Sequence, residues 1–368
     1  MFIPSAKSLT SMLVLCIIAI GLFIWVENSR VMVKERYHDE KLEAAKTMEE
    51  AIESIRDYRL AQGIFVDERN DPHRTTLIGE RETLITTDRG SLVAKLTSLN
   101  PNYAAVIVDY FKEAGLKEGD LVAVSGTGSF PAINIAVMSA AKVMELDLVM
   151  IYSVGASMFG ATDPEFTWLD METFLYEQEI FPYKSIAASI GGGQDLGRGL
   201  SMVGRELIIE AIERNEVELV AENTLTENII RKKELWEQAS ADRSYKMYVN
   251  VGGGLSSLGH SITGRLIRPG YHRYISMRNV PLKGTMMLFA EQRVPILHLL
   301  DISAIAEKYD LPLAPDPLPA PGVGSMYISE RYNMTITWIS LAIMVILIAT
   351  VIFFDHNKLR LKEEEINI

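Results

Sequence analysis

Cysteine is nearly absent from this chain of 368 residues, in which Cys16 is the only one. A single cysteine cannot close an internal disulfide or build a cysteine-ligated metal site. The Gly-Lys-Ser/Thr ending of a nucleotide P-loop is also missing, and so is the Gly-x-Ser-x-Gly elbow of many hydrolases. We therefore expect no bound metal and no cofactor.

Acidic residues are missing from residues 243–290, although the whole chain has 48 of them and a net charge of −12. This stretch holds five arginines, two lysines and two histidines. If it folds onto one face, it makes a positive cleft that focuses anionic ligands; the alternative is pairing with acids from other segments. The arginines suited to bidentate binding of carboxylate or phosphate are Arg265, Arg268, Arg273 and Arg278. The negative overall charge argues against a nucleic-acid partner.

Two long apolar runs, residues 9–26 and 334–354, stand near the two ends of the chain. About 20 apolar residues are needed to cross the hydrocarbon core of a bilayer as a helix. The first run is longer than the core of a usual signal peptide, and no small-x-small cleavage site follows it. We therefore predict a membrane protein that crosses the membrane twice.

Basic residues near the second run indicate its orientation. Lys358, Arg360 and Lys362 follow this run, whereas only Arg331 closely precedes it, which places the C-terminus in the cytoplasm. The charges around the first run favour the opposite orientation weakly. We predict that both termini are cytoplasmic and that the main domain is extracytoplasmic.

The region between the apolar runs divides by composition. Apolar residues within 34–62 recur every three and four positions, which predicts an amphipathic helix, either packed on its own domain or forming a stalk that pairs with another subunit. Five prolines within 311–322 predict an extended spacer that holds the domain off the membrane. The expected segments are thus a tail over 1–8, a membrane helix over 9–26, a helical stalk over 34–62, an α/β domain of one or two lobes over 63–310, a spacer over 311–322, a membrane helix over 334–354 and a charged tail over 355–368.

Strand and helix patterns alternate through the middle of the chain. Short apolar runs predict strands over 121–124, 148–152, 186–190, 217–220 and 246–251. Helical patterns between them cover 132–144, 202–214 and 226–239. This alternation predicts an α/β fold with a doubly wound, mostly parallel, Rossmann-like sheet, flanked by the two transmembrane helices.

Glycine-rich turns follow three of the predicted strands, at residues 125–129, 191–195 and 252–257. Glycine lets the backbone approach a ligand closely, and the loops after parallel strands meet at one edge of the sheet. We expect one anion-binding site there, although each turn could also be purely structural. The expected ligand-binding residues are Ser125, Gly126, Gly128, Ser129, Gly191, Gly192, Gly193, Arg198, Gly252, Gly253, Gly254, Arg265, Arg268 and Arg273.

The first turn does not match a dinucleotide fingerprint. Pro131 occupies the position of the third glycine, and no carboxylate follows the next predicted strand at Tyr152 and Ser153. Binding of a nicotinamide cofactor or ATP is therefore disfavoured.

Candidate catalytic residues lie in two segments. Ser256, Ser257 and His260 lie close in sequence, and a serine near a histidine can be an activated nucleophile. Four carboxylates surround a tryptophan in residues 163–172, where they could act in acid/base chemistry, ligate a metal or form an acid-rich first turn of a helix. Whether the chain is an enzyme stays open.

Five segments resemble the poly-γ-glutamate system protein family of bacterial membrane proteins. They are SLNPNYAA at 98–105, KEGDLVAV at 117–124, GSFPAINIA at 128–136, SVGAS at 153–157 and DPEFTWLDME at 163–172. The resemblance implies an accessory role in the synthesis or export of this capsule polymer, with the polymer or a small polycarboxylate and other subunits of the synthase complex as partners. The alternatives are an enzyme acting on γ-glutamyl amide bonds and a purely architectural subunit.

Overall fold

The computed structural model describes residues 8–276, 280 and 282–366, with side chains up to residue 356 at the C-terminal end. The chain divides into two compact units. One is formed by Met1–Glu35 with Ile328–Ile368, and the other by Arg36–Tyr327.

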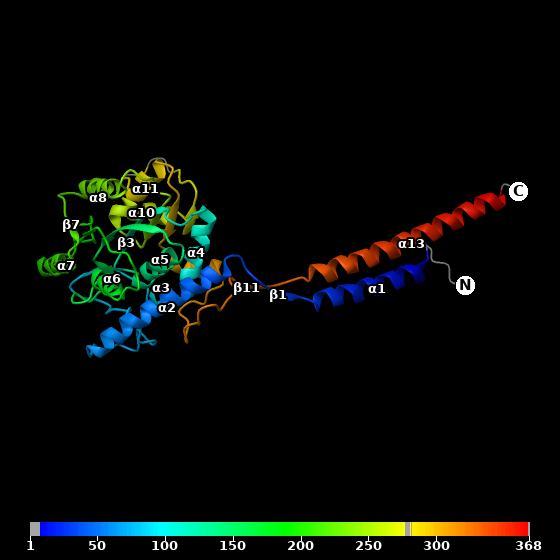
Figure 1. Cartoon of the computed structure of the whole chain (residues 1–368), viewed down its shortest axis with the longest axis horizontal. Helices are drawn as coiled ribbons and strands as arrows, with labels where there is room; N and C mark the ends of the chain where they lie inside the picture. Colours follow the sequence, from blue (N-terminus) through cyan, green and yellow to red (C-terminus); the bar gives the residue numbers. More distant parts are fainter. Residues whose placement is uncertain (1–7, 277–279, 281, 367–368) are drawn as a thin grey trace. The chain divides into compact units, whose positions relative to one another are not determined.

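Two long apolar helices dominate the first unit. Helix α1 spans Leu9–Glu27, and helix α13 spans Met334–Ile366, of which Met334–His356 is apolar and long enough to cross a membrane. The two helices lie side by side (Figure 1). This pair fits a two-pass membrane protein, as the apolar runs predicted.

A short ribbon joins the chain segments next to these helices. Strand β1 (Val31–Lys34) pairs antiparallel with β11 (Ile328–Arg331). The Arg331 guanidinium donates to both carboxylate oxygens of Glu35, at 2.7 and 2.8 Å. This bidentate contact fixes the register of the ribbon more firmly than a single hydrogen bond.

A seven-stranded sheet forms the centre of the second unit. Across the sheet the order is β7 (Glu218–Val220), β6 (Ala187–Ser189), β4 (Asp147–Ser153), β3 (Leu121–Thr127), β8 (Met247–Val251), β10 (Ile296–Leu299) and β9 (Gly270–His272). All neighbouring strands are parallel except β10 and β9. The predicted mixed α/β class with a mostly parallel sheet is confirmed. The order reverses between β3 and β8, because the chain runs outward through β4, β6 and β7 before β8 forms.

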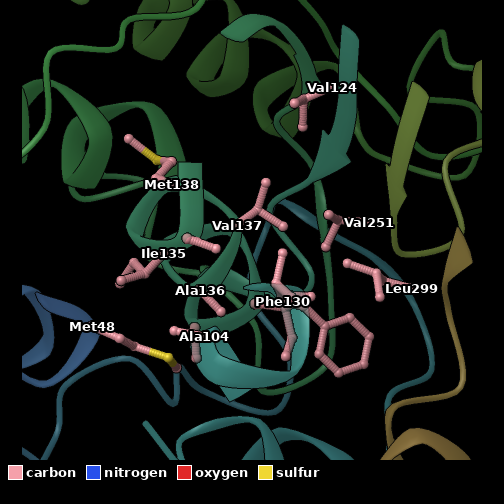
Figure 2. Packing of buried hydrophobic residues seen from close by; sticks show 14 of the residues in the cluster. Met48, Ala104, Val124, Phe130, Ile135, Ala136, Val137, Met138, Val251 and Leu299 are labelled. Atoms are coloured by element: carbon pink, nitrogen blue, oxygen red, sulfur yellow. The ribbon is translucent and has the colours of Figure 1, made fainter. Parts of the chain in front are cut away.

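Helices cover both faces of this sheet because its central strands are apolar on both sides. Val122 and Val124 of β3 belong to one core cluster with Met48 of α2 (His38–Ala61). Ala123 of β3 packs in a second cluster with Trp236 of α8 (Leu225–Ala239). Figure 2 shows part of the first cluster, with side chains from α2, α4 and α5 beside those of β3, β8 and β10. The helices of this unit are α2 (His38–Ala61), α3 (Leu92–Ser98), α4 (Asn102–Ala114), α5 (Pro131–Val143), α6 (Trp168–Glu177), α7 (Met202–Arg214), α8 (Leu225–Ala239), α9 (Leu255–Leu258), α10 (Ser261–Leu266), α11 (Thr285–Glu291) and α12 (Ile302–Lys308).

Helix α2 lies within the compact unit rather than forming a free stalk. Its apolar face, which includes Ala44, Met48 and Ile55, is fully buried against α4 and α5. Of the two possibilities for residues 34–62, the structure has the packed helix. Burial of an apolar face against neighbouring helices gives more stability than helix propensity alone.

The proline-rich segment 311–322 is not a spacer, contrary to its prediction. Its backbone hydrogen-bonds to the domain: Asn102 Nδ2 donates to the Ala320 carbonyl, and the Ala314 N–H donates to Thr97 Oγ1. Proline-rich backbone makes few hydrogen bonds within itself, so its free groups are available to side chains of α3 and α4. Sequence spacing alone does not reveal those partners.

The first glycine turn also begins later than predicted. Strand β3 continues through Ser125, Gly126 and Thr127, which pair with β4. A Cβ on Gly126 would lie 2.1 Å from the Tyr152 ring, so glycine is needed here for close strand packing. Two short strands, β2 (Thr86–Asp88) and β5 (Ala156–Ser157), pair in parallel. Strand β5 contacts the turn after β3, where the Ser157 N–H donates to Ser129 Oγ.

Candidate functional site: a cleft at the carboxyl ends of the strands

A cleft of about 890 Å³ opens where the central strands end. Thr127 of β3 and Ser153 of β4 lie in its wall, together with Gly253 after β8 and Leu300 after β10. In open α/β sheets ligands bind in the crevice outside these carboxyl ends, next to the point where strand order reverses. The three predicted turns therefore meet at one place.

Part of the predicted set lines this cleft. The members in the wall are Ser129, Gly192, Gly193, Arg198, Gly253, Gly254, Arg265 and Arg268. The residues that do not line it are Ser125, Gly126, Gly128, Gly191, Gly252 and Arg273. Arg278 lies outside the described residues.

Several glycines behind the wall serve packing. A Cβ on Gly128 would lie 2.4 Å from the Val154 carbonyl, and one on Gly252 would lie 2.6 Å from Thr127 Oγ1. Gly252 also has φ +83°, a conformation that L side chains rarely adopt. These glycines do not line the cleft, but they let the turns that line it pack closely against each other.

Gly252→Ala is expected to destabilise the fold by about 2–4 kcal/mol, the sum of left-handed backbone strain and the clash with Thr127. Gly115→Ala is the matched control, because Gly115 has φ +79° but nothing within 4 Å of the added Cβ. Urea unfolding of both variants measures the difference. Equal losses would show that the contact with Thr127 is unimportant.

Four exposed arginines in the wall make no ion pair within the described part of the chain: Arg89, Arg198, Arg265 and Arg268. Arg265 and Arg268 belong to the acid-free stretch 243–290, in which other basic residues do find partners. Arg243 pairs with Asp147 at 2.6 Å, and Lys283 pairs with Glu291 at 2.5 Å. Asp88 and Asp301 also line the cleft. The wall therefore has an excess of positive charge.

A buried lysine, Lys95 of α3, also lines the cleft. No sequence pattern indicated this residue. Its Nζ donates to Ser157 Oγ at 2.9 Å and to the Ser129 carbonyl, and it lies 3.7 Å from the centre of the Phe130 ring. Burial lowers the pKa of this amine to about 7. Lysine side chains are usually exposed, so the sequence of α3 does not indicate that Lys95 is buried. Only its tertiary contacts identify it as part of the site.

A second buried lysine joins the turns. Lys232 Nζ lies 2.8 Å from Asp195 Oδ2 and 2.7 Å from both Ser189 Oγ and Ser256 Oγ. Asp195 Oδ1 in turn accepts from Ser153 Oγ at 2.7 Å. Burial lowers the pKa of the Lys232 amine, and the Asp195 carboxylate opposes that shift. Helix α8, two strand ends and two glycine turns are thereby tied together.

The three predicted catalytic candidates do not form a catalytic group. Ser256 is buried against Lys232, and Ser257 Oγ is buried 2.8 Å from the Tyr248 hydroxyl. His260 is exposed, and its Nδ1 accepts from the Ile262 N–H at the start of α10. No hydrogen bond links His260 to either serine in the residues that the structure covers. Closeness in sequence did not become closeness of the reactive atoms.

His298 in the wall of the cleft, and two carboxylates of the acidic segment 163–172, have structural partners. His298 Nε2 donates to the Gly264 carbonyl, its Nδ1 accepts from Asn250, and burial lowers the pKa of the ring to about 4. In the acidic segment, Asp170 caps α6. Buried Glu172 accepts from Ser185, and burial raises its pKa to about 7. Among the described residues, no three potential metal ligands gather.

The cleft thus combines unpaired guanidinium groups, glycine backbone and a lysine amine next to a serine hydroxyl. This set can hold carboxylates, and it can move a proton at Ser157 Oγ. No protein-family model, no curated protein and no solved structure matches the chain. We therefore infer the chemistry of the cleft from these residues alone.

Proposed function

We propose that this chain is a membrane-anchored component of poly-γ-glutamate synthesis or export that holds the polymer, or a small polycarboxylate, in the cleft. The observation that carries the proposal is a group of four guanidiniums around one cavity, those of Arg89, Arg198, Arg265 and Arg268, which make no ion pair with any described residue. Guanidinium binds carboxylate through two parallel hydrogen bonds, and this polymer carries one carboxylate on each residue.

The size and polarity of the cleft support the same ligand class. About 890 Å³ lies at the upper end of the usual range for ligand sites, which leaves room for a short oligomer rather than a single amino acid. Asp88 and Asp301 provide acceptors for the amide N–H groups of a γ-linked backbone. Nucleic acid fits poorly, because the net charge is −12.

The doubly wound, Rossmann-like arrangement is part of this proposal. It is supported by the reversal of strand order between β3 and β8 and by helices on both faces of the sheet. In such sheets the crevice at the reversal is the usual ligand site. In the cell we place both termini in the cytoplasm and this domain outside, next to the other subunits of a polymer-exporting complex.

Titration of the detergent-solubilised full chain with γ-linked glutamate oligomers tests the function. We expect binding at low salt that weakens as salt is raised. Replacing Arg265 and Arg268 together by alanine should weaken binding by roughly 100-fold, because each lost charged hydrogen bond is worth about 1.5 kcal/mol or more. Arg243→Ala is the control, since Arg243 pairs with Asp147 outside the cleft. Absent binding, or an equal loss in the control, contradicts the proposal.

A further inference from the structure

Ser157 and Lys95 form a hydroxyl–amine pair in the wall of the cleft. Ser157 is the last residue of β5 and is partly exposed, whereas Lys95 on α3 is 1% exposed. Lys95 Nζ lies 2.9 Å from Ser157 Oγ. This distance allows direct proton transfer between the two atoms.

The surrounding residues fix both members of the pair. The Ser157 N–H donates to Ser129 Oγ at 3.0 Å, and the Ser129 carbonyl accepts from Lys95 Nζ. The neighbouring loop approaches closely as well, because a Cβ on Gly90 would lie 3.2 Å from Ser157 Oγ. The hydroxyl is therefore oriented before any ligand arrives, which favours catalysis over mere contact.

The charge around Lys95 suits a general base. No carboxylate pairs with Lys95 in the part of the chain that the structure describes, and burial holds its pKa near neutrality. Uncharged amine is then present near neutral pH and can accept a proton. Lys232 also contacts a serine, but it is paired with Asp195, and Ser256 is closed off from solvent.

We propose that Ser157 is the nucleophile, and Lys95 its general base, in cleavage or transfer of amide bonds within carboxylate-rich chains held in the cleft. This inference rests on the proposed function, because the same arginines must hold the chain whose amide is attacked. The cleft would then process the polymer rather than only bind it.

The step balances without a cofactor. Ser157 Oγ attacks the amide carbonyl carbon, an O–C bond forms, and the hydroxyl proton passes to Lys95 Nζ. The C–N bond then breaks, and Lys95 returns the proton to the leaving amine, which leaves an ester on Ser157. Water, or the amine end of another chain, attacks this ester and gives its proton to Lys95. The C–O bond to Ser157 breaks, and Ser157 Oγ regains a proton from Lys95.

Two readouts on the full chain in detergent test the pair: release of new amines from γ-linked glutamate oligomers, and covalent labelling by a fluorophosphonate probe followed by peptide mapping. We expect the label on Ser157. Ser157→Ala should lower amine release by roughly 1000-fold or more and remove the label, and Lys95→Met should lower both by roughly 100-fold or more. Ser325→Ala and Lys308→Met are matched controls outside the cleft, and we expect no loss in either.

Oligomer binding separates the two proposals. Ser157→Ala should still bind the oligomers, which also shows that the variant is folded. Binding by the wild type without amine release or labelling of Ser157 overturns the catalytic inference and leaves the binding function in place. Labelling of Ser157 without oligomer binding overturns the proposed function while supporting the nucleophile. Labelling that Lys95→Met leaves unchanged overturns the role of Lys95.

Discussion

Lys232→Met is expected to destabilise the domain by about 3–5 kcal/mol, because it leaves the buried Asp195 carboxylate without its cation. Ser189 and Ser256 lose a hydrogen-bond partner in the same change. Urea unfolding of the full chain in detergent, followed through buried Trp168 and Trp236, measures the loss.

Removing both charges distinguishes pairing from packing. Lys232→Met combined with Asp195→Asn should recover part of the stability, because no uncompensated charge then stays buried. Lys233→Met is the control: Lys233 is the next residue of α8 and pairs with exposed Glu237. A loss in the control as large as that of Lys232→Met would show that the buried pair has no special weight.

The stability of the wild type should rise between about pH 7 and pH 10.5 because of Lys95. Its pKa falls from an ordinary value of 10.5 to about 7 in the fold, so in this window the unfolded chain binds a proton that the folded chain does not. The full rise amounts to about 5 kcal/mol at 1.36 kcal/mol for each pKa unit. It vanishes below pH 7, where both states are protonated.

Lys95→Met should abolish this rise, so the comparison with wild type across pH isolates it from other titrating groups. Lys308→Met is the control, since Lys308 also lies over an aromatic ring, that of Tyr110, but on α12 outside the cleft. Unfolding free energies at pH 7, 8, 9 and 10 are sufficient. Parallel curves for wild type and Lys95→Met would mean that burial does not depress this amine.

Local patterns predicted much of the architecture. The helix over 202–214 has those bounds in the structure, and the strand over 246–251 differs by one residue, because apolar periodicity and flanking turns determine such elements. The convergence of the glycine turns followed from the parallel sheet. Ser125 and Gly126 were assigned to a turn instead of β3, since glycine suits both a turn and close strand packing.

The reactive pair could not be found in this way. Ser157 is the last residue of the segment SVGAS, where no pattern marks it as reactive, and Lys95 lies 62 positions earlier. Their contact depends on the tertiary arrangement that brings Lys95 of α3 to Ser157 of β5. Likewise, the pairing of Asp195 with Lys232 is a property of the assembled core. The absence of an ion pair between Arg265 and any described residue also depends on where distant carboxylates lie in the fold.

The ribbon of β1 and β11 has a consequence for proteolysis. The two strands pair from Val31 with Arg331 to Lys34 with Ile328, so the domain is an insertion within a hairpin of two apolar helices. A protease that cuts one surface loop of this insertion produces two fragments, and each keeps its own helix. With both helices in a membrane, as we propose, a single nick therefore releases no soluble piece, and shedding requires two cuts.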